Sequence, residues 1–247
     1  MIKDGALRDP AVDAMVSFHL WNPLPAGTVG LRPGPLWASV DELRITIKGK
    51  GGHGAAPHNN IDPIPVAAQL VLALQTLISR ESSPFQPAVL TIGSIQGGTA
   101  WNITPEQVAL TGTMRTFDTA QRDAMIERVE DLVRGVCLAT RTDYEFEAIF
   151  SAPPVINDPA VTETIRRVAE RTFGTDRVTT VDQSMLGDDI SYFFNEVPGC
   201  SIMVGSSDLE RGLNKSHHHP QFDFDEAALP IGAELLIASA LELLKEV

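Results

Sequence analysis

The 247-residue sequence contains little cysteine and comparatively few basic residues. Its two cysteines, Cys137 and Cys200, are too few and too far apart to form a disulfide framework, so we expect a reducing, cytoplasmic location. Nineteen Lys and Arg residues against 32 Asp and Glu residues give a net charge of -13 at pH 7. Because this negative field repels phosphate backbones and anionic lipid, we expect no nucleic-acid partner and no membrane partner.

Long apolar segments and several common catalytic motifs are also missing. The longest uncharged apolar stretch, residues 63–79, is interrupted by Gln69, Gln75 and Thr76 and is shorter than a membrane span requires. The opening residues, MIKDG, lack the apolar core of a signal peptide. No Gly-x-Ser-x-Gly elbow, Walker loop or Cys-x-x-Cys pair occurs, so serine-hydrolase, P-loop and zinc-finger interpretations have no support.

The hydrophobic pattern of residues 41–150 predicts a compact unit of strands and helices, and a hydrophobic content of 43% is sufficient for a buried core. Leu43, Ile45 and Ile47 alternate with polar residues, which predicts a strand with one buried face. Similar β-rich or alternating patterns predict strands over residues 89–95, 108–115 and 144–148.

Two amphipathic helices are predicted between these strands. The first begins at Pro63 or Pro65, and its expected inward residues are Ile64, Ala67, Ala68, Val71, Leu74 and Ile78. The second is capped by Asp118, has Gln121 at the capping-box position, and has the expected inward residues Ile126, Val129, Val133, Val136 and Cys137. The resulting order, β-α-β-β-α-β, is that of a ferredoxin-like unit.

The flanking segments, residues 1–40 and 151–247, predict a single α/β domain into which residues 41–150 are inserted. Residues 11–20 and 200–204 are short apolar runs typical of strands that are buried on both faces. Helices are expected from Asp158, as the N-cap, to Phe173, and from Asp225 or Glu226 to Leu244. Residues 1–7 resemble the tail of a helix, so we expect the outer domain to be part of a longer fold.

The six histidines fall into three groups: His19 near the end of an apolar strand, His53 and His58 in a glycine-rich loop, and the tract His217–His219. An imidazole at a strand end is a common metal ligand on a rigid support. The alternatives are a buried structural histidine at position 19 and a solvated loop at the tract. Acidic residues just beyond the tract could hydrogen-bond to its histidines, or they could simply place negative charge at the N-terminus of the last helix. These residues are Asp223, Asp225 and Glu226.

Two further side chains are candidates for substrate binding. Asn102 follows the glycines of residues 97–98 and is either a turn residue or a hydrogen-bond donor to substrate. Arg115 lies on a predicted strand among threonines, where its guanidinium could grip a carboxylate with two bonds or simply face solvent.

Five sequence blocks together resemble the co-catalytic metal amidohydrolases of the aminoacylase and carboxypeptidase family, which includes hippurate hydrolase and the N-acyl-amino-acid and indole-acetyl-amino-acid hydrolases. The resemblance covers essentially the whole chain. The blocks are SFHLW (17–21), GGHGAAPH (51–58) followed by IDPI (61–64), GGTAWNITP (97–105), GTMRTF (112–117) and HHPQFDFDE (218–226).

The resemblance implies a partial catalytic α/β domain with a ferredoxin-like lid and dimerisation domain inserted at residues 41–150. His19 and His218 match ligands of two divalent ions, zinc or manganese, with His217 and His219 as register alternatives. His53 matches the lid histidine that steadies the oxyanion in the neighbouring subunit's site. Asn102 and Arg115 match groups that hold the acyl or carboxylate end of an N-acyl amino acid. The implied enzyme is a cytoplasmic homodimer that hydrolyses this amide bond.

Two departures from the family pattern qualify this prediction. The family's Glu-Asp-Phe loop reads Asp188-Asp189-Ile190 here, and the upstream His-x-Asp or Cys-x-His ligand block and the paired glutamates have no counterpart. A metal-activated water needs a base to take its proton, so we expect the chain to be a fragment of a longer enzyme and to bind metal incompletely. The alternatives are a non-catalytic dimerising module and a dipeptidase or carboxypeptidase of the same family.

Overall fold

A computed structural model describes residues 1–245 of the chain. It divides into two compact units, each containing strands and helices, so the fold is mixed α/β. Unit 1 consists of Met1–Leu36, Val155–Ser184 and Asp188–Val247, and unit 2 of Trp37–Pro154 and Met185–Gly187.

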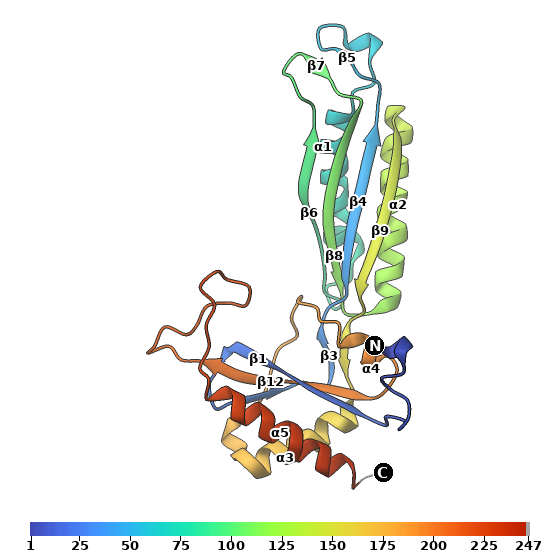
Figure 1. Ribbon diagram of the computed structural model, residues 1–247. Helices are drawn as coiled ribbons and strands as arrows, with labels where there is room; N and C mark the ends of the chain where they lie inside the picture. The colour runs from blue at the N-terminus through green and yellow to red at the C-terminus, as the bar shows by residue number, and fades with distance from the viewer. Residues whose placement is uncertain (246–247) are drawn as a thin grey trace. The chain divides into compact units, whose positions relative to one another are not determined.

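Unit 2 is built on a four-stranded antiparallel sheet (Figure 1). Its strands are β4 (Val40–Lys48), β6 (Ala88–Gly97), β8 (Gln107–Thr116) and β9 (Asp143–Ala152), in the order β6-β8-β4-β9. Helices α1 (Pro63–Thr76) and α2 (Thr119–Thr140) pack on one face, and α1 continues into a π-helical turn, η3 (Leu77–Glu81). The remaining elements of the unit are two-residue strands β5 (Gly52–His53) and β7 (Ile103–Thr104) and the 3-10 turn η2 (Pro57–Asn59).

The predicted strands of this unit are present, and the alternation in β4 has the expected cause. Leu43, Ile45 and Ile47 are buried against the helices, whereas Arg44 is exposed. The predicted inward face of α1 is partly wrong, because Ile64 is 45% exposed and the buried residues include Val66 and Leu70. This helix is apolar around most of its circumference, so hydrophobic periodicity could not identify the side that faces the sheet.

The expected N-cap of α2 is present, but only one of the two hydrogen bonds of the capping box forms. The carboxylate of Asp118 accepts the backbone N–H of Gln121 at 2.7 Å. The side-chain amide of Gln121 instead donates to the carbonyl oxygen of Gln86 at 2.8 Å, so it ties the helix to the loop before β6. Met125, Val129 and Val133 form the buried stripe of the helix.

Unit 1 is built on a four-stranded mixed sheet with the order β1-β12-β2-β11. Its strands are β1 (Met15–Pro25), β2 (Val29–Leu31), β11 (Val178–Thr180) and β12 (Gly199–Ser207), and β1 and β12 run parallel. Every residue of β12 is buried, as predicted for its apolar core at residues 200–204. A separate pair joins β3 (Gly34–Trp37) and β10 (Val155–Asn157).

The helices of unit 1 are α3 (Pro159–Phe173), α4 (Ser191–Phe194) and α5 (Ala228–Leu243), with 3-10 turns η1 (Ile2–Asp4) and η4 (Thr175–Arg177). Helix α3 has the predicted N-cap, since Asp158 accepts two backbone N–H groups. Helix α5 begins at Ala228, later than predicted, because Asp225 forms a preceding turn with Ala227. The predicted helix tail at residues 1–7 is only the short turn η1.

The segment Pro63–Glu81, which includes α1, is long and apolar enough by length and composition to cross a membrane, contrary to the sequence-based expectation. Its inward side chains, including Leu70 and Leu74, form part of the hydrophobic core of unit 2. A core helix of this kind passes the same test of length and composition.

Candidate functional site

His19 of β1 lies beside His217 of the tract, with their ring centroids 5.1 Å apart. Both rings bond to one backbone carbonyl: the oxygen of Leu20 is 2.6 Å from His19 Nδ1 and 2.8 Å from His217 Nε2. A carbonyl oxygen only accepts, so these two nitrogens carry protons. The lone pairs of the neutral rings are then on His19 Nε2 and His217 Nδ1, a tautomer assignment that favours metal coordination through those atoms.

Aromatic side chains surround His217. Trp21 stacks on its ring, with the ring centroids 5.2 Å apart. The centroid of the Phe222 ring lies 5.0 Å from that of His217. Burial lowers the pKa of His217, and the neighbouring His19 and His218 lower it further, whereas the bond to Leu20 opposes the shift. These effects favour the neutral imidazole, which is the form that coordinates a metal.

His218, the residue favoured by the resemblance as the second ligand, is exposed and has φ 64, in the left-handed region. It stands in a tight turn closed by the bond from the N–H of His219 to the carbonyl of Ser216 at 3.1 Å. Glycine is the usual residue at a turn position with positive φ. The structure thus places His217 next to His19 and His218 one residue further along the turn, and the assignment of ligand roles between them stays a prediction.

The two imidazoles suit a divalent transition metal, but they are only part of a ligand set. Within residues 1–245 there is no group of three or more His, Cys, Asp or Glu side chains that could hold a metal ion. Asp188 accepts the N–H of Ile190 at the start of α4, and Asp225 pairs with Arg211 at 3.4 Å. These acidic residues therefore have structural partners of their own.

His53 and Asn102 lie on two loops of unit 2 that are joined by the short pair β5 and β7. The N–H of Gly54 donates to the carbonyl of Asn102 at 2.8 Å, and a Cβ on Gly54 would come within 2.9 Å of that oxygen. The N–H of Ala55 donates to His53 Nδ1 at 3.0 Å. In the neutral ring the proton is then on Nε2, so the exposed His53 presents an N–H donor to its surroundings.

Arg115 lies near the opposite end of the sheet from His53 and Asn102 (Figure 1). It is eight residues along β8 from Gln107, or roughly 27 Å at about 3.4 Å per residue. Burial lowers the pKa of the partly buried guanidinium, and the charge of Asp41 opposes this shift. Within the described part of the chain, no hydrogen bond or ion pair holds the guanidinium of Arg115, so its donors can receive a carboxylate.

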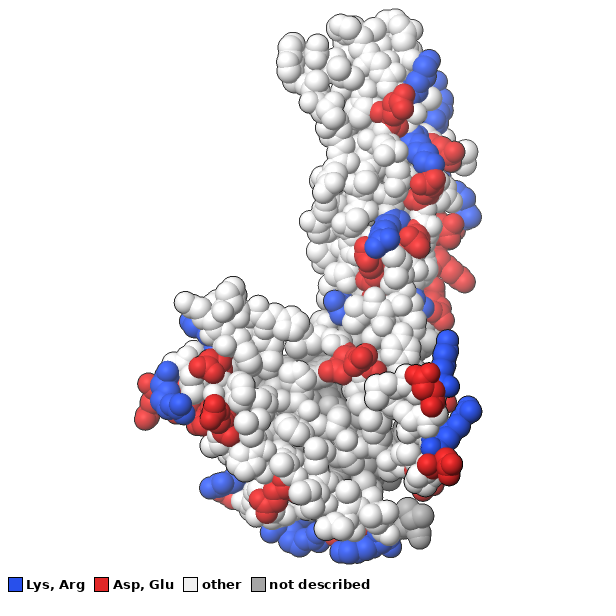
Figure 2. Space-filling view, viewed as in Figure 1, with Lys and Arg blue, Asp and Glu red and all other residues white. Residues whose placement is uncertain are grey.

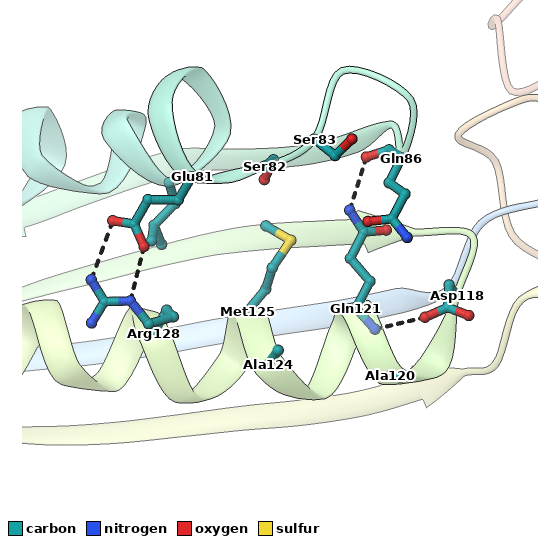
Figure 3. Close-up of a pocket in the computed structure, with 11 residues that line it drawn as sticks. Glu81, Ser82, Ser83, Gln86, Asp118, Ala120, Gln121, Ala124, Met125 and Arg128 are labelled. Atoms are coloured by element: carbon teal, nitrogen blue, oxygen red, sulfur yellow. Dashed lines mark hydrogen bonds and ion pairs between the residues drawn. The ribbon is translucent and has the colours of Figure 1, made fainter.

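A pocket of about 330 Å³ in unit 2 contains none of the predicted site residues (Figure 3). It lies between η3, the following loop and the start of α2. An ion pair of 2.9 Å between Glu81 and Arg128 bounds it, and the bond from Gln121 to Gln86 crosses it. Its two carboxylates, Glu81 and Asp118, are bonded to Arg128 and to the start of α2, and the described residues form no metal-binding group here.

The sequence did not point to Asn22, which the structure places next to the histidine tract. Asn22 is 6% exposed and bonds to residues on either side of that tract. Its sequence neighbours give no sign of this role, because the bonded carbonyls belong to residues far along the chain.

Comparison with known proteins shows the family of the chain. The family model described as peptidase family M20/M25/M40 matches residues 1–242. The chain is 36% identical over 246 residues to the N-acetyl-L-cysteine deacetylase of Bacillus subtilis, covering 99% of the chain and 56% of that protein. It is 33% identical over 251 residues to the IAA-amino acid hydrolase ILR1-like 4 of Arabidopsis thaliana, covering 100% of the chain and 56% of that protein.

A solved structure is also similar over the whole chain. The crystal structure of Bacillus subtilis YxeP, described as a dinuclear metal-binding peptidase of the M20 family, has a TM-score of 0.80 and 30% sequence identity. The match covers 100% of this chain and 61% of the other. The chain therefore spans less than two thirds of the length of these relatives.

Proposed function

The chain belongs to peptidase family M20/M25/M40, and from this we propose that it acts in metal-dependent hydrolysis of the amide bond of N-acyl amino acids in the cytoplasm. The observation that carries the proposal is the pair formed by His19 and His217, whose rings share the carbonyl of Leu20. The relatives include a deacetylase and an amino-acid conjugate hydrolase, which act on acylated amino acids by their names.

In this proposal His19 and one histidine of the tract, His218 or His217, contribute to holding two divalent ions, zinc or manganese. When bound, the metal supplies Lewis acidity at the amide carbonyl. The bond from His19 Nδ1 to the carbonyl of Leu20 orients the imidazole of His19 and leaves Nε2 as the nitrogen that can coordinate a metal. The lowered pKa of His217 favours a neutral ring, in which Nδ1 is the coordinating atom.

The substrate contacts would come from unit 2, which we propose to be a ferredoxin-like lid. The order of its elements, β4-α1-β6-β8-α2-β9, and its sheet order support this assignment. The Nε2–H of His53 can donate to the oxyanion that develops on the carbonyl oxygen during hydrolysis. Arg115 would bind the substrate carboxylate, and Asn102 would bind the acyl end.

The separation between these groups supports a homodimer. His53 and Asn102 lie at one end of the sheet, whereas Arg115 lies near the other, a distance far greater than the length of an N-acyl amino acid. One small substrate cannot touch both ends of one lid. If both act, the loop that carries His53 serves the site of the partner subunit.

The edge of the lid sheet also supports association between copies. Strand β6 is an edge strand, and neither β6 nor α1 contains a charged residue. Exposed apolar side chains occur on both elements, namely Leu72 at 72% and Ile95 at 53%. Charged residues instead gather on the side of the unit formed by α2 and β9 (Figure 2). An uncharged edge is suited to pairing with a second copy.

The proposal is tested by metal analysis of the purified chain together with hydrolysis of hippurate and N-acetylated amino acids. Because the upstream ligand block and the paired glutamates have no counterpart in this chain, we expect weak metal binding that is lost in His19→Asn, and a low turnover that falls about 100- to 1000-fold further in His53→Asn, as for loss of an oxyanion donor. His58→Asn is the matched control, because His58 lies exposed in the same loop without an assigned role. Bound metal without turnover would indicate a fragment that lacks its base, whereas metal-free wild-type protein would favour the non-catalytic dimerising module.

The contribution of the partner is tested by mixing two inactive variants. A refolded equal mixture of His19→Asn and His53→Asn forms hybrid dimers in half of the molecules, and each hybrid has one site with both histidines. We expect about a quarter of the wild-type activity from this mixture. No recovery would contradict the proposal that His53 acts in the neighbouring site. Activity on dipeptides rather than N-acyl amino acids would identify the protein as a dipeptidase of the same family.

A further inference from the structure

The loop between β12 and α5, residues 208–227, carries the histidine tract, and one buried amide on β1 holds both of its arms. We infer that Asn22 is a positioning residue that fixes the tract beside His19. The inference rests on the proposed function, because the tract matters for catalysis only if its imidazoles bind metal.

Both the NH₂ group and the carbonyl oxygen of the Asn22 side chain are hydrogen-bonded. Its Nδ2 donates to the carbonyl of Lys215 and to the carbonyl of Asp223, each at 2.9 Å. Its Oδ1 accepts from the hydroxyl of Ser206 at 2.6 Å. Because Lys215 precedes the tract and Asp223 follows it, one NH₂ group closes the segment that contains all three histidines.

The orientation of this amide is fixed by its surroundings. Ser206 is wholly buried in β12, and its backbone carbonyl accepts the N–H of Asp225, which adds a second tie to the loop. The regular pairing of β1 with β12 ends at Trp21 and shifts before Pro25, so Asn22 stands at an irregular point of the strand. Two donors are required at this point, and the Asn side chain provides both in one plane.

Three consecutive residues of β1 therefore contact the tract segment. Leu20 accepts from the ring of His217, Trp21 stacks on that ring, and Asn22 binds the backbone on both sides. The first two contacts act on the imidazole itself. Of these three residues, Asn22 is the one whose side chain bonds to the backbone of the segment, on both sides of the turn in which His218 has its positive φ. Loss of the amide is expected to release the turn while the sheet remains intact.

The test replaces Asn22 by Asp, which has almost the same shape but cannot donate to two carbonyls. The matched control is Asn157→Asp. Asn157 is likewise a buried residue of unit 1, and its amide also donates to two carbonyls, those of Arg32 and Ser201, but it does not contact the tract. Both variants lose equivalent bonds, so a general loss of stability would affect both.

Two measurements are made on each variant: hydrogen exchange of peptides from residues 208–224 in metal-free protein, and affinity for Co²⁺ followed by its visible absorption. For Asn22→Asp we expect exchange of these peptides to become at least about tenfold faster, and Co²⁺ affinity to fall about 10- to 100-fold. For Asn157→Asp we expect exchange of these peptides and Co²⁺ affinity to stay within about twofold of wild type.

Unchanged exchange in the tract of Asn22→Asp would overturn the inference, as would equal effects of the two variants. The exchange measurement needs no metal, so it judges the role of Asn22 separately from the proposed function. If wild-type protein binds no Co²⁺, the proposed function fails, and the exchange data still decide whether Asn22 holds the tract. If wild type and Asn22→Asp bind Co²⁺ equally, the role in positioning ligands is wrong.

Discussion

Replacing Arg122 by Met should destabilise the protein more than loss of any exposed ion pair, because it leaves a buried carboxylate without its partner. Asp41 is wholly buried, and its oxygens accept from Arg122 Nε at 2.9 and 3.0 Å and from Arg122 Nη2 at 2.5 Å. The guanidinium also lies over the ring of Phe150, with its Cζ 4.2 Å from the ring centroid. The side chain of Arg122 is 15% exposed.

Breaking a buried pair on one side typically costs about 3 to 5 kcal/mol. We expect a loss of about 3 kcal/mol, since Arg122 retains some exposure and the nearby charge of Arg115 partly compensates Asp41. The assay is equilibrium unfolding in urea, followed by circular dichroism. The double variant Asp41→Asn/Arg122→Met removes the unpaired charge as well, so it should be more stable than Arg122→Met alone.

Arg128→Met is the control for this prediction. Arg128 is on the same helix and also bonds to carboxylates, those of Glu81 and Asp131, but it is exposed. Exposed ion pairs contribute little because water already solvates and screens both charges. If Arg122→Met and Arg128→Met shift the urea midpoint equally, or if the double variant is less stable than Arg122→Met, the argument from burial is wrong.

Two further predictions concern the backbone of the tract and a buried thiol. Because His218 has φ 64, His218→Gly should be more stable than His218→Ala by about 0.5 to 1 kcal/mol in urea unfolding. Both variants lose metal affinity if this histidine is a ligand. An Ala variant as stable as the Gly variant would show that the turn is not strained. Burial raises the pKa of the Cys200 thiol to about 11 from its ordinary value of 9.0, so its contribution to stability is complete below pH 9 and is lost as pH rises through 11. The difference in stability between wild type and Cys200→Ala should therefore shrink between these pH values. Native protein at pH 8 should resist alkylation of Cys200 by iodoacetamide, and rapid labelling of the native protein would contradict this prediction.

Sequence periodicity predicted those elements that are half buried. The strand around Leu43 and Ile45 shows a clear alternation because one face of its sheet packs on helices. Helix α3 begins after Asp158 and ends at Phe173 as predicted, because an Asp N-cap is a strong local signal. The inward face of α1 was not predictable in this way, since apolar residues such as Leu72 occur on its exposed side as well.

The candidate site was only partly predictable for a different reason. Histidines far apart in sequence could be grouped by their residue type, and His19 does lie beside the tract. The choice among His217, His218 and His219 depends on the backbone of a tight turn, where successive side chains point in different directions. The role of Asn22 depends on carbonyl groups about 200 residues away, and any residue type could supply them.

Trp21 makes the tract observable without an added label. Its indole is stacked on an imidazole at 5.2 Å, so its fluorescence will change when that ring moves away or binds a cation. The other tryptophans belong to the second unit, where Trp37 is buried and Trp101 is 97% exposed. With Trp101→Phe as the background, stopped-flow emission could time the opening of the tract in milliseconds and follow a cation entering it.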